Sequence, residues 1–198
     1  MQVRLTEDII ICMAQFYTRN GDDGYTGLLG KGRVPKYHPQ TEAVGAVDEA
    51  TASLGMARSL SHAPQTAPLL VMVQRDLYHL MAEIAATPEN AARFRVIDTA
   101  RVEWLEENTD AISARIELPK EFILPGDSAS GAALAVARTI VRRSERRVAE
   151  LLHQGLLENR ELLRYLNRLS SLCYVLELLE NQATGNSGLT LAKEDEKA

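Results

Sequence analysis

Apolar residues recur at every third or fourth position over most of the stretch from residue 39 to residue 183, and this period constrains the fold most. In an α-helix such residues share one face, which must be buried against other helices. Proline and glycine interrupt the pattern, and five helices are expected, at about 39–60, 68–87, 96–112, 128–153 and 160–183. The sequence therefore predicts an all-α fold, a five-helix bundle with ferritin-like up-down packing.

A chain of 198 residues with 45% hydrophobic side chains is typical of one soluble globular domain. Its formal net charge of −5 argues against general nucleic-acid affinity, and aromatic residues at 5% provide no set of stacking platforms for single strands. Cys12 and Cys173 lie far apart without a CxxC partner, which favours buried thiols in a reduced compartment over a disulfide or a zinc site. We expect a cytoplasmic protein without a nucleic-acid or membrane partner.

The predicted domain covers residues 17–185, with a short segment on either side. Residues 1–16 form an N-terminal extension, and its apolar run at 9–14 is too short to span a bilayer and wrongly flanked for a secretion signal. This extension could be a leader, an extra strand or a start-site artefact. Residues 186–198 are expected to form a disordered tail.

Ahead of the first helix lies a glycine-rich N-terminal arm, with five glycines between residues 21 and 32. This density rules out a helix and makes a regular strand unlikely. Such an arm can present several backbone N–H groups to one anion. Four side chains could add donors: Thr18, Thr26, Lys31 and Lys36. The arm matches neither a GxGxxG loop nor a Walker A loop, which would need glycine where Tyr25 stands. A flexible surface loop is the alternative interpretation.

The predicted fourth helix carries five arginines within ten residues. Arg138, Arg142 and Arg146 are spaced i, i+4, i+8, which lays their guanidinium groups along one stripe of the helix. A stripe of permanently charged, bidentate donors suits a polyanion such as a phosphate chain. Glu145 could hold Arg142 in place or help to hold a Mg²⁺ carried by a nucleotide. The alternative is a helix face that is only solvated or paired with glutamate.

The last predicted helix has a polar row separate from its apolar face. The row consists of Asn167, Ser170, Ser171 and Tyr174. An asparagine within a helix usually turns its amide toward a partner, because it is a poor helix former. We therefore expect Asn167 to contact a neighbouring helix or a ligand.

Two other kinds of site fit the sequence poorly. A di-iron bundle needs two Glu-x-x-His pairs, and although Glu150 and His153 form one, the second candidate has Asp76 ahead of His79. Glu150 also falls near the end of its predicted helix, a poor place for a core metal site. A serine or cysteine nucleophile lacks support because no GxSxG elbow is present and both cysteines lie in apolar runs.

Several motifs, taken in order, resemble those of PduO-type ATP:cob(I)alamin adenosyltransferases. They are residues 18–30 (TRNGDDGYTGLLG), 33–36 (RVPK), 42–49 (EAVGAVDE), 122–126 (FILPG), 137–148 (ARTIVRRSERRV) and 164–170 (RYLNRLS). The resemblance covers about residues 17 to 183. It implies a trimer with active sites between neighbouring subunits, in which Co(I) of cob(I)alamin attacks C5′ of ATP to give adenosylcobalamin and triphosphate.

The resemblance also implies roles for individual residues. ATP with Mg²⁺ would be bound by Thr18, Arg19, Gly21, Thr26, Gly27, Lys36, Arg142, Arg143, Glu145, Arg146 and Asn167. Arg142, Glu145 and Phe122 would serve catalysis, with Phe122 at the corrin, where it displaces the lower ligand. Asp48 would pair with Arg138 across the subunit interface. A reductase and an adenosylcobalamin-dependent acceptor enzyme are the implied protein partners.

Co(I) is a strong nucleophile and needs no protein base, which agrees with the lack of a catalytic dyad. The chain departs from the family's usual residues at Gln40, Thr41, Val44, Ala50, Thr51 and Asp127. These departures concern the corrin side and the first helix rather than the ATP-binding set. The alternative function is a non-catalytic ATP- or corrinoid-binding protein, or a scaffold, on the same helical bundle.

Overall fold

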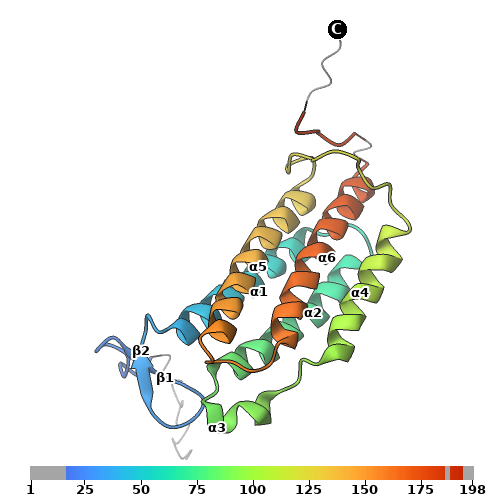
Figure 1. Cartoon of the computed structure of the whole chain (residues 1–198). Coiled ribbons are helices and arrows are strands. Elements are labelled where there is room, and N and C mark those ends of the chain that lie inside the picture. The colour runs from blue at the N-terminus through green and yellow to red at the C-terminus, as the bar shows by residue number, and fades with distance from the viewer. Residues whose placement is uncertain (1–16, 186–187, 194–198) are drawn as a thin grey trace, which may run out of the picture.

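The computed structural model describes residues 17–185 and 188–193, and five long helices form its core (Figure 1). These are α1 (Pro39–Leu60), α2 (Thr66–Ala85), α4 (Thr99–Ser113), α5 (Ala129–His153) and α6 (Glu161–Ala183). The predicted five-helix bundle is confirmed. A short helix, α3 (Pro88–Ala91), and a 3₁₀ turn, η1 (Ala92–Phe94), follow α2. Neither was predicted, because so few residues cannot display a helical period. The extension 1–16, including Cys12, lies outside the described residues.

The helices pack as an antiparallel bundle in which each connection reverses the chain direction (Figure 1). Helix α1 packs against both α2 and α5, α5 packs against α6, and α6 packs against α4. Antiparallel pairing of α1 and α5 is evident in the buried hydroxyl of Ser144, which donates to the carbonyl of Ala46 at 2.7 Å. Helix α5 is therefore the central element, with α1 along one side and α6 along the other.

Three helix starts follow the capping chemistry of the sequence. Pro39 occupies the first turn of α1, and Ser128 caps α5 by accepting from Gly131 N at 2.9 Å. Asp98 caps α4 by accepting from Arg101 N at 3.0 Å. This cap moves the start of the helix from the predicted residue 96 to Thr99, so Ile97 is buried from outside the helix.

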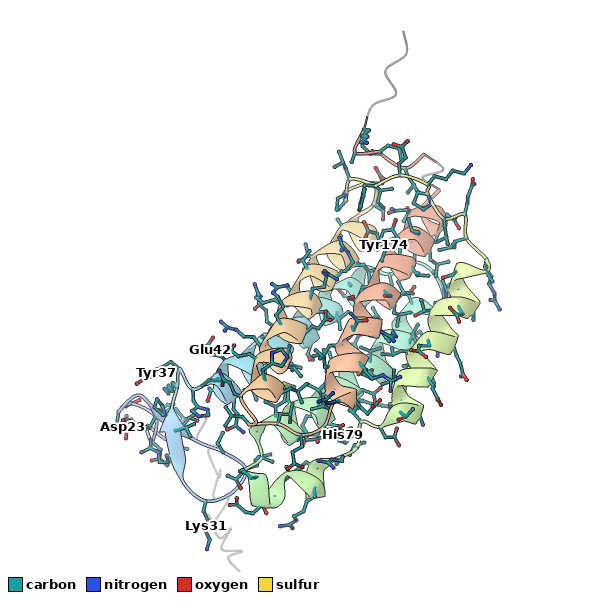
Figure 2. The ribbon with its side chains drawn as sticks, viewed as in Figure 1. Asp23, Lys31, Tyr37, Glu42, His79 and Tyr174 are labelled. Carbon is teal, nitrogen blue, oxygen red and sulfur yellow. The ribbon has the colours of Figure 1, made fainter. Side chains whose placement is uncertain are left out.

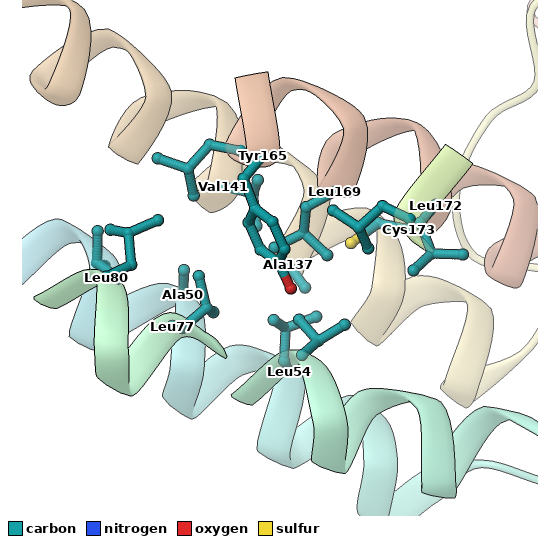
Figure 3. Packing of buried hydrophobic residues seen from close by; sticks show 14 of the residues in the cluster. Ala50, Leu54, Leu77, Leu80, Ala137, Val141, Tyr165, Leu169, Leu172 and Cys173 are labelled. Atoms are coloured by element: carbon teal, nitrogen blue, oxygen red, sulfur yellow. The ribbon is translucent and has the colours of Figure 1, made fainter. Parts of the chain in front are cut away.

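The hydrophobic core contains residues of all five long helices and is mostly aliphatic (Figure 3). Leu54, Leu77 and Leu169 are fully buried, and each such side chain contributes about 1.5–3 kcal/mol through removal from water. Tyr165 is the largest buried side chain, and its hydroxyl donates to Asp76 Oδ2 at 2.7 Å. Trp104 is only partly buried and packs against the core, whereas Val102 and Leu105 of the same helix are fully buried.

The glycine-rich arm contains a hairpin, so the prediction that regular strands are unlikely there is wrong for six residues. Strand β1 (Tyr25–Gly27) pairs antiparallel with β2 (Arg33–Pro35), with Thr26 opposite Val34. Gly24 and Gly32 have φ values of 81° and 101° and lie just outside the strands. These glycines provide left-handed turn residues at the strand ends, and the strands themselves need only ordinary extended backbone.

The two ends of the bundle carry different structures (Figure 1). The arm and α3 lie at the end where α1 begins. The α4–α5 connection lies at the opposite end, beside the last part of the chain. There, Leu191 forms an antiparallel bridge with Ile123. The expected disordered tail is therefore wrong for residues 188–193, because their backbone is paired with a connection more than sixty residues away.

Candidate functional site

The arm is organised around one ion pair between Asp23, ahead of β1, and Arg33 of β2. Both terminal nitrogens of Arg33 donate to the Asp23 carboxylate, at 2.7 and 2.8 Å. Arg33 also donates to the carbonyl of Tyr25 at 3.1 Å and to that of Asn20. The hydrogen bonds that the Asp23 carboxylate accepts from Arg33 and from Tyr25 N lower the pKa of Asp23 below its ordinary value. An exposed ion pair alone contributes little, but four convergent bonds on one guanidinium give the arm a defined shape.

The arm is also docked onto the end of α2 by backbone hydrogen bonds. Leu29 N donates to the carbonyl of Ala85 at 2.7 Å, and Thr87 N donates to the carbonyl of Leu29 at 3.3 Å. The next residue, Gly30, lies so close to Thr87 that a Cβ at this position would be 2.1 Å from the Thr87 hydroxyl oxygen. A flexible surface loop is therefore not what the structure has, and Gly30 is needed for the close approach.

The residues predicted to bind ATP from the arm lie partly together. Lys36 lies over Gly21, where a Cβ would be 3.0 Å from the lysine Nζ. Arg19 has a φ of 63° and lies over the Tyr17 ring at 5.4 Å. Thr18, Thr26 and Gly27 line the same hairpin, and Thr18 Oγ1 accepts weakly from Asn20 N at 3.4 Å. Lys31, at the tip of the hairpin, projects away from the bundle (Figure 2).

The five arginines of α5 do not all face the same way, because successive residues of an α-helix are rotated by about 100°. Arg143 pairs with Glu49 of α1, and Arg147 pairs with Glu42 of α1 at 3.7 Å. Both guanidiniums are therefore turned toward α1, away from α6. Sequence reasoning placed Arg143 with Arg142, but within one chain the two do not converge.

On the other side of α5, Glu145 and Asn167 join α5 to α6. Asn167 Nδ2 donates to Glu145 Oε1 at 2.9 Å, and Arg168 donates to Asn167 Oδ1 at 2.6 Å. The expectation that Asn167 turns its amide toward a partner is confirmed. Among the described residues, Glu145 accepts from the Asn167 amide and not from Arg142.

Arg142 and Arg146 are exposed on the outer surface of α5 between these two groups of contacts. Arg146 donates to the Arg142 carbonyl at 3.0 Å. Within the described part of the chain, no carboxylate or carbonyl accepts from the Arg142 guanidinium. Arg142 therefore remains available to an anion, next to a carboxylate and an amide that are already held in place.

Phe122 lies at the opposite end of the bundle, with 87% of its surface exposed. It borders a cavity of about 430 Å³. The other lining residues are Pro119, Lys120, Glu121, Ile123, Pro125, Arg138, Tyr174 and Glu177. Sequence reasoning did not single out Glu177, although its one signal was visible: it is a charged residue flanked by leucines in the last helix.

Residues 190–192 hold the Phe122 loop. Ala192 N donates to the Phe122 carbonyl, and Leu124 N donates to the Thr190 carbonyl, both at 2.7 Å. Asp127 accepts from the Thr190 backbone N at 3.0 Å and from its hydroxyl at 2.7 Å. This contact gives Asp127, one of the departures from the family pattern, a clear structural role.

Most of the other residues that depart from the family pattern also have structural roles within one chain. Gln40 is buried and donates to the carbonyls of Ile84 at 3.0 Å and Ala86 at 3.2 Å, which ties the start of α1 to the end of α2. Ala50 is fully buried and Val44 packs against the core. Thr51 bonds within its own helix, to Val47 O at 3.0 Å. The Thr41 hydroxyl is buried without a partner, and nothing in the structure explains it.

One chain alone does not bring the arm and Phe122 together. Helix α5 has 25 residues, a length of about 37 Å, and the two features lie near its opposite ends. Asp48 is exposed on α1, whereas Arg138 lies on the α6 side of α5. Their proposed pair is not made within the chain and stays a prediction for the assembled protein.

The residues considered for a di-iron centre are engaged elsewhere. Asp76 accepts from Tyr165 and from Arg101, and Glu150 accepts from Arg147 at 3.1 Å. Among the described residues, no three histidines, cysteines or carboxylates come together as metal ligands. Cys173 is buried, and burial raises its pKa to about 12, so it is no nucleophile. Nor does any helix in the described ranges have the length and apolar character to cross a membrane.

The family model for cobalamin adenosyltransferase matches residues 16–180. PduO corrinoid adenosyltransferases of Citrobacter freundii and Salmonella typhimurium are 39% and 37% identical over 166 residues. These matches cover 83% of this chain and 49% of each relative, so the chain spans about half the length of both relatives. The corrinoid adenosyltransferase of Bacillus subtilis is 35% identical over 175 residues, which cover 86% of this chain and 89% of that protein.

Solved structures agree with this match. A variant PduO-type ATP:co(I)rrinoid adenosyltransferase from Lactobacillus reuteri, complexed with ATP, has a TM-score of 0.82 and 30% identity over 89% of this chain and 99% of that one. A second variant from the same organism, complexed with cobalamin and ATP, has a TM-score of 0.82 and 31% identity over 91% and 100%. The matched stretch contains the arm, the arginines of α5, Asn167 and the Phe122 loop. This chain therefore belongs to the cobalamin adenosyltransferase family.

Proposed function

We propose that the protein transfers the 5′-deoxyadenosyl group of ATP to the cobalt of cob(I)alamin, giving adenosylcobalamin and triphosphate. The observation that carries this proposal is the unpaired guanidinium of Arg142 beside the fixed Glu145–Asn167 pair. This arrangement offers a permanent cation, a carboxylate and an amide to one triphosphate. Relatives described with ATP and with cobalamin support the choice of substrates.

In the proposed reaction, the electron pair of Co(I) forms the bond to C5′ while the C5′–O bond breaks. The leaving electron pair stays on the triphosphate, and no proton has to be moved. The protein therefore needs to orient C5′ and to stabilise charge that grows on the leaving group. Arg142 and Arg146 are suited to stabilise that charge. The backbone N–H groups of the arm and the Lys36 side chain are suited to bind the rest of the triphosphate.

Mg²⁺ is the expected companion of ATP, and the residues present fit it. Asn167 occupies only Oε1 of Glu145, which leaves Oε2 as a hard oxygen ligand of the kind that Mg²⁺ prefers. Bound there, Mg²⁺ would neutralise part of the triphosphate charge. Glu145 would thus contribute to metal binding, while Asn167 fixes its orientation.

The corrinoid is proposed to bind at the end of the bundle that carries Phe122. The exposed aromatic ring borders an open cavity, as is suitable for contact with a large flat ligand and for displacing its lower ligand. Because Phe122 and the arm lie far apart in one chain, we propose a homotrimer in which one subunit supplies the arm and its neighbour the corrin side. The Asp48–Arg138 pair would then join the two subunits.

Cytoplasmic location, a reductase that delivers Co(I) and an enzyme that accepts adenosylcobalamin belong to the same proposal. The two protein partners follow from the chemistry, since Co(I) must be generated by reduction and the product is itself a cofactor. Their identities need direct interaction experiments.

The test is anaerobic incubation of the protein with reduced cobalamin and MgATP, following the loss of the Co(I) spectrum. Arg142→Ala should slow turnover about 100-fold or more, as is typical for loss of one charge-stabilising donor. Arg147→Ala is the matched control, because Arg147 lies on the same helix but is paired with Glu42 and Glu150. A Co(I) spectrum that persists with the wild-type protein would favour the non-catalytic binding protein or scaffold.

A further inference from the structure

The cavity beside Phe122 has a polar floor that the proposed mechanism does not use. Phe122 and two prolines form an apolar rim, while Arg138, Tyr174 and Glu177 lie on the helices α5 and α6 beneath. Tyr174 and Glu177 are three residues apart on α6, and they therefore share one face of that helix. Figure 2 shows Tyr174 on the half of the bundle nearer the α4–α5 connection.

Glu177 is a charged residue with only 1% of its surface exposed. Its Oε1 is buried without a hydrogen-bond partner, and no described residue forms an ion pair with it. Burial raises the pKa of this carboxyl to about 7, and the charge of Arg138 opposes the rise. An unsatisfied carboxylate oxygen in such a place costs about 1–3 kcal/mol or more, so its retention calls for a partner.

Arg138 provides the complementary group on the neighbouring helix. Its Nε is buried and also lacks an acceptor among the described residues. The pair proposed with Asp48 of a neighbouring subunit can use the terminal nitrogens and leave Nε free. The cavity floor thus presents one unused donor and one unused acceptor.

A ligand for this floor must therefore carry both a donor and an acceptor while remaining neutral. A carboxylate ligand would be repelled by Glu177, and an ammonium group by Arg138. A primary carboxamide satisfies both conditions, because its N–H₂ donates and its C=O accepts. The edge of a cobalamin ring carries several such groups, as acetamide and propionamide side chains.

We propose that Glu177 and Arg138 form a subsite that binds a peripheral carboxamide of the corrinoid, with the amide N–H₂ donating to Glu177 and its C=O accepting from Arg138. The inference rests on the proposed function and adds a specificity-determining residue on the corrin side. The benzimidazole of the lower ligand fits less well, since its free ring nitrogen only accepts.

The test compares three kinds of corrinoid. Each is assayed as a substrate, and the Co(II) form of each is titrated into the protein in an equilibrium binding experiment. Cobalamin has all the carboxamides, cobinamide has them but lacks the benzimidazole nucleotide, and cobalamin monocarboxylic acids have one propionamide hydrolysed. The variants are Glu177→Leu, which loses the acceptor, and Glu177→Gln, which keeps a neutral one. Glu121→Gln is the charge-matched control, since Glu121 lines the same cavity but is exposed.

Glu177→Leu should weaken cobalamin and cobinamide about tenfold each, whereas Glu177→Gln and Glu121→Gln should stay within about threefold. Wild type should bind at least one monocarboxylic acid about tenfold less well than cobalamin, and Glu177→Gln should largely abolish that preference. The same preference in Glu177→Gln as in wild type would overturn the proposal, as would a Glu177→Leu defect confined to cobalamin. If the wild-type protein binds these corrinoids but does not turn them over, the proposed function is refuted. The binding data for the variants still decide the subsite proposal in that case.

Discussion

Gly30→Ala is the substitution that most directly tests how the arm is docked. The added Cβ would be 2.1 Å from Thr87 Oγ1 and 2.6 Å from its Cγ2, against 3.4 Å for ordinary contact. Relief requires the arm to move by about 1 Å, which would disrupt the Leu29–Ala85 and Thr87–Leu29 hydrogen bonds. The glycine matters through proximity here, and not through an unusual backbone conformation.

Overpacking of this kind costs about 1–3 kcal/mol. The arm is an appendage outside the core, so this cost should appear as loss of docking more than as global unfolding. If docking is required for ATP binding, the Kd for MgATP should rise about 5- to 150-fold, since 1.4 kcal/mol corresponds to tenfold. Isothermal titration with MgATP measures the change, and the thermal midpoint should fall only slightly.

Thr87→Ala provides the internal control, because it removes the two atoms that the new Cβ meets most closely and leaves only Asn90 Nδ2, the end of a side chain, at 2.9 Å. The double variant should regain ATP affinity to within about threefold of wild type, a coupling that a double-mutant cycle quantifies. If Gly30→Ala binds MgATP as wild type does, or if Thr87→Ala gives no rescue, docking of the arm is not what prepares it for ATP.

Three further predictions concern the rest of the molecule. Burial raises the pKa of Glu177 from 4.5 to about 7, so the folded protein holds a proton that the unfolded chain has released, and stability should fall as pH rises from about 5 to 8. In denaturant unfolding, Glu177→Gln should remove up to about 3 kcal/mol of that fall. Thr190→Val deletes a hydrogen bond to Asp127 and should raise the KM for cobalamin about fivefold without changing that for ATP, in steady-state assays. Tyr165→Phe deletes the buried bond to Asp76 and should cost about 1–3 kcal/mol in urea unfolding.

Each of these three predictions has an outcome that would contradict it. An equal pH dependence in wild type and Glu177→Gln would mean that this carboxyl ionises normally. Equal changes in both KM values for Thr190→Val would mean that the tail acts on the whole fold. A loss below about 0.5 kcal/mol for Tyr165→Phe would mean that Arg101 alone satisfies Asp76.

The helices could be predicted because their signals are local. The apolar period, Pro39 and the cap at Ser128 are each read from a few neighbouring residues. The observed ends of the five long helices differ from the predicted ends by at most three residues. The hairpin of the arm was missed because its order comes from Asp23 and Arg33, ten positions apart, and not from alternation of apolar residues. An ion pair between residues so far apart in the sequence produces no periodic pattern of apolar residues.

The arrangement of the predicted site residues could not be read from the sequence. Successive residues of an α-helix are rotated by about 100°, so Arg143 and Glu145, two positions apart, point in nearly opposite directions, Arg143 toward Glu49 and Glu145 toward Asn167. Glu177 was overlooked because a single charge among leucines reads as a surface position. Only its burial against Arg138 makes it distinctive.

The pairing of the tail with the Phe122 loop has a consequence for how strongly the two must attract each other. Only residues 184–187 separate the end of α6 from Gly188, so the tail is tethered beside its partner at an effective concentration in the millimolar range. At that concentration an intrinsic affinity of about 4 kcal/mol already keeps the pair half formed. A corrinoid that binds the backbone of the Phe122 loop would have to displace the tethered tail. A corrinoid that packs against the paired tail and loop would instead find this surface already formed.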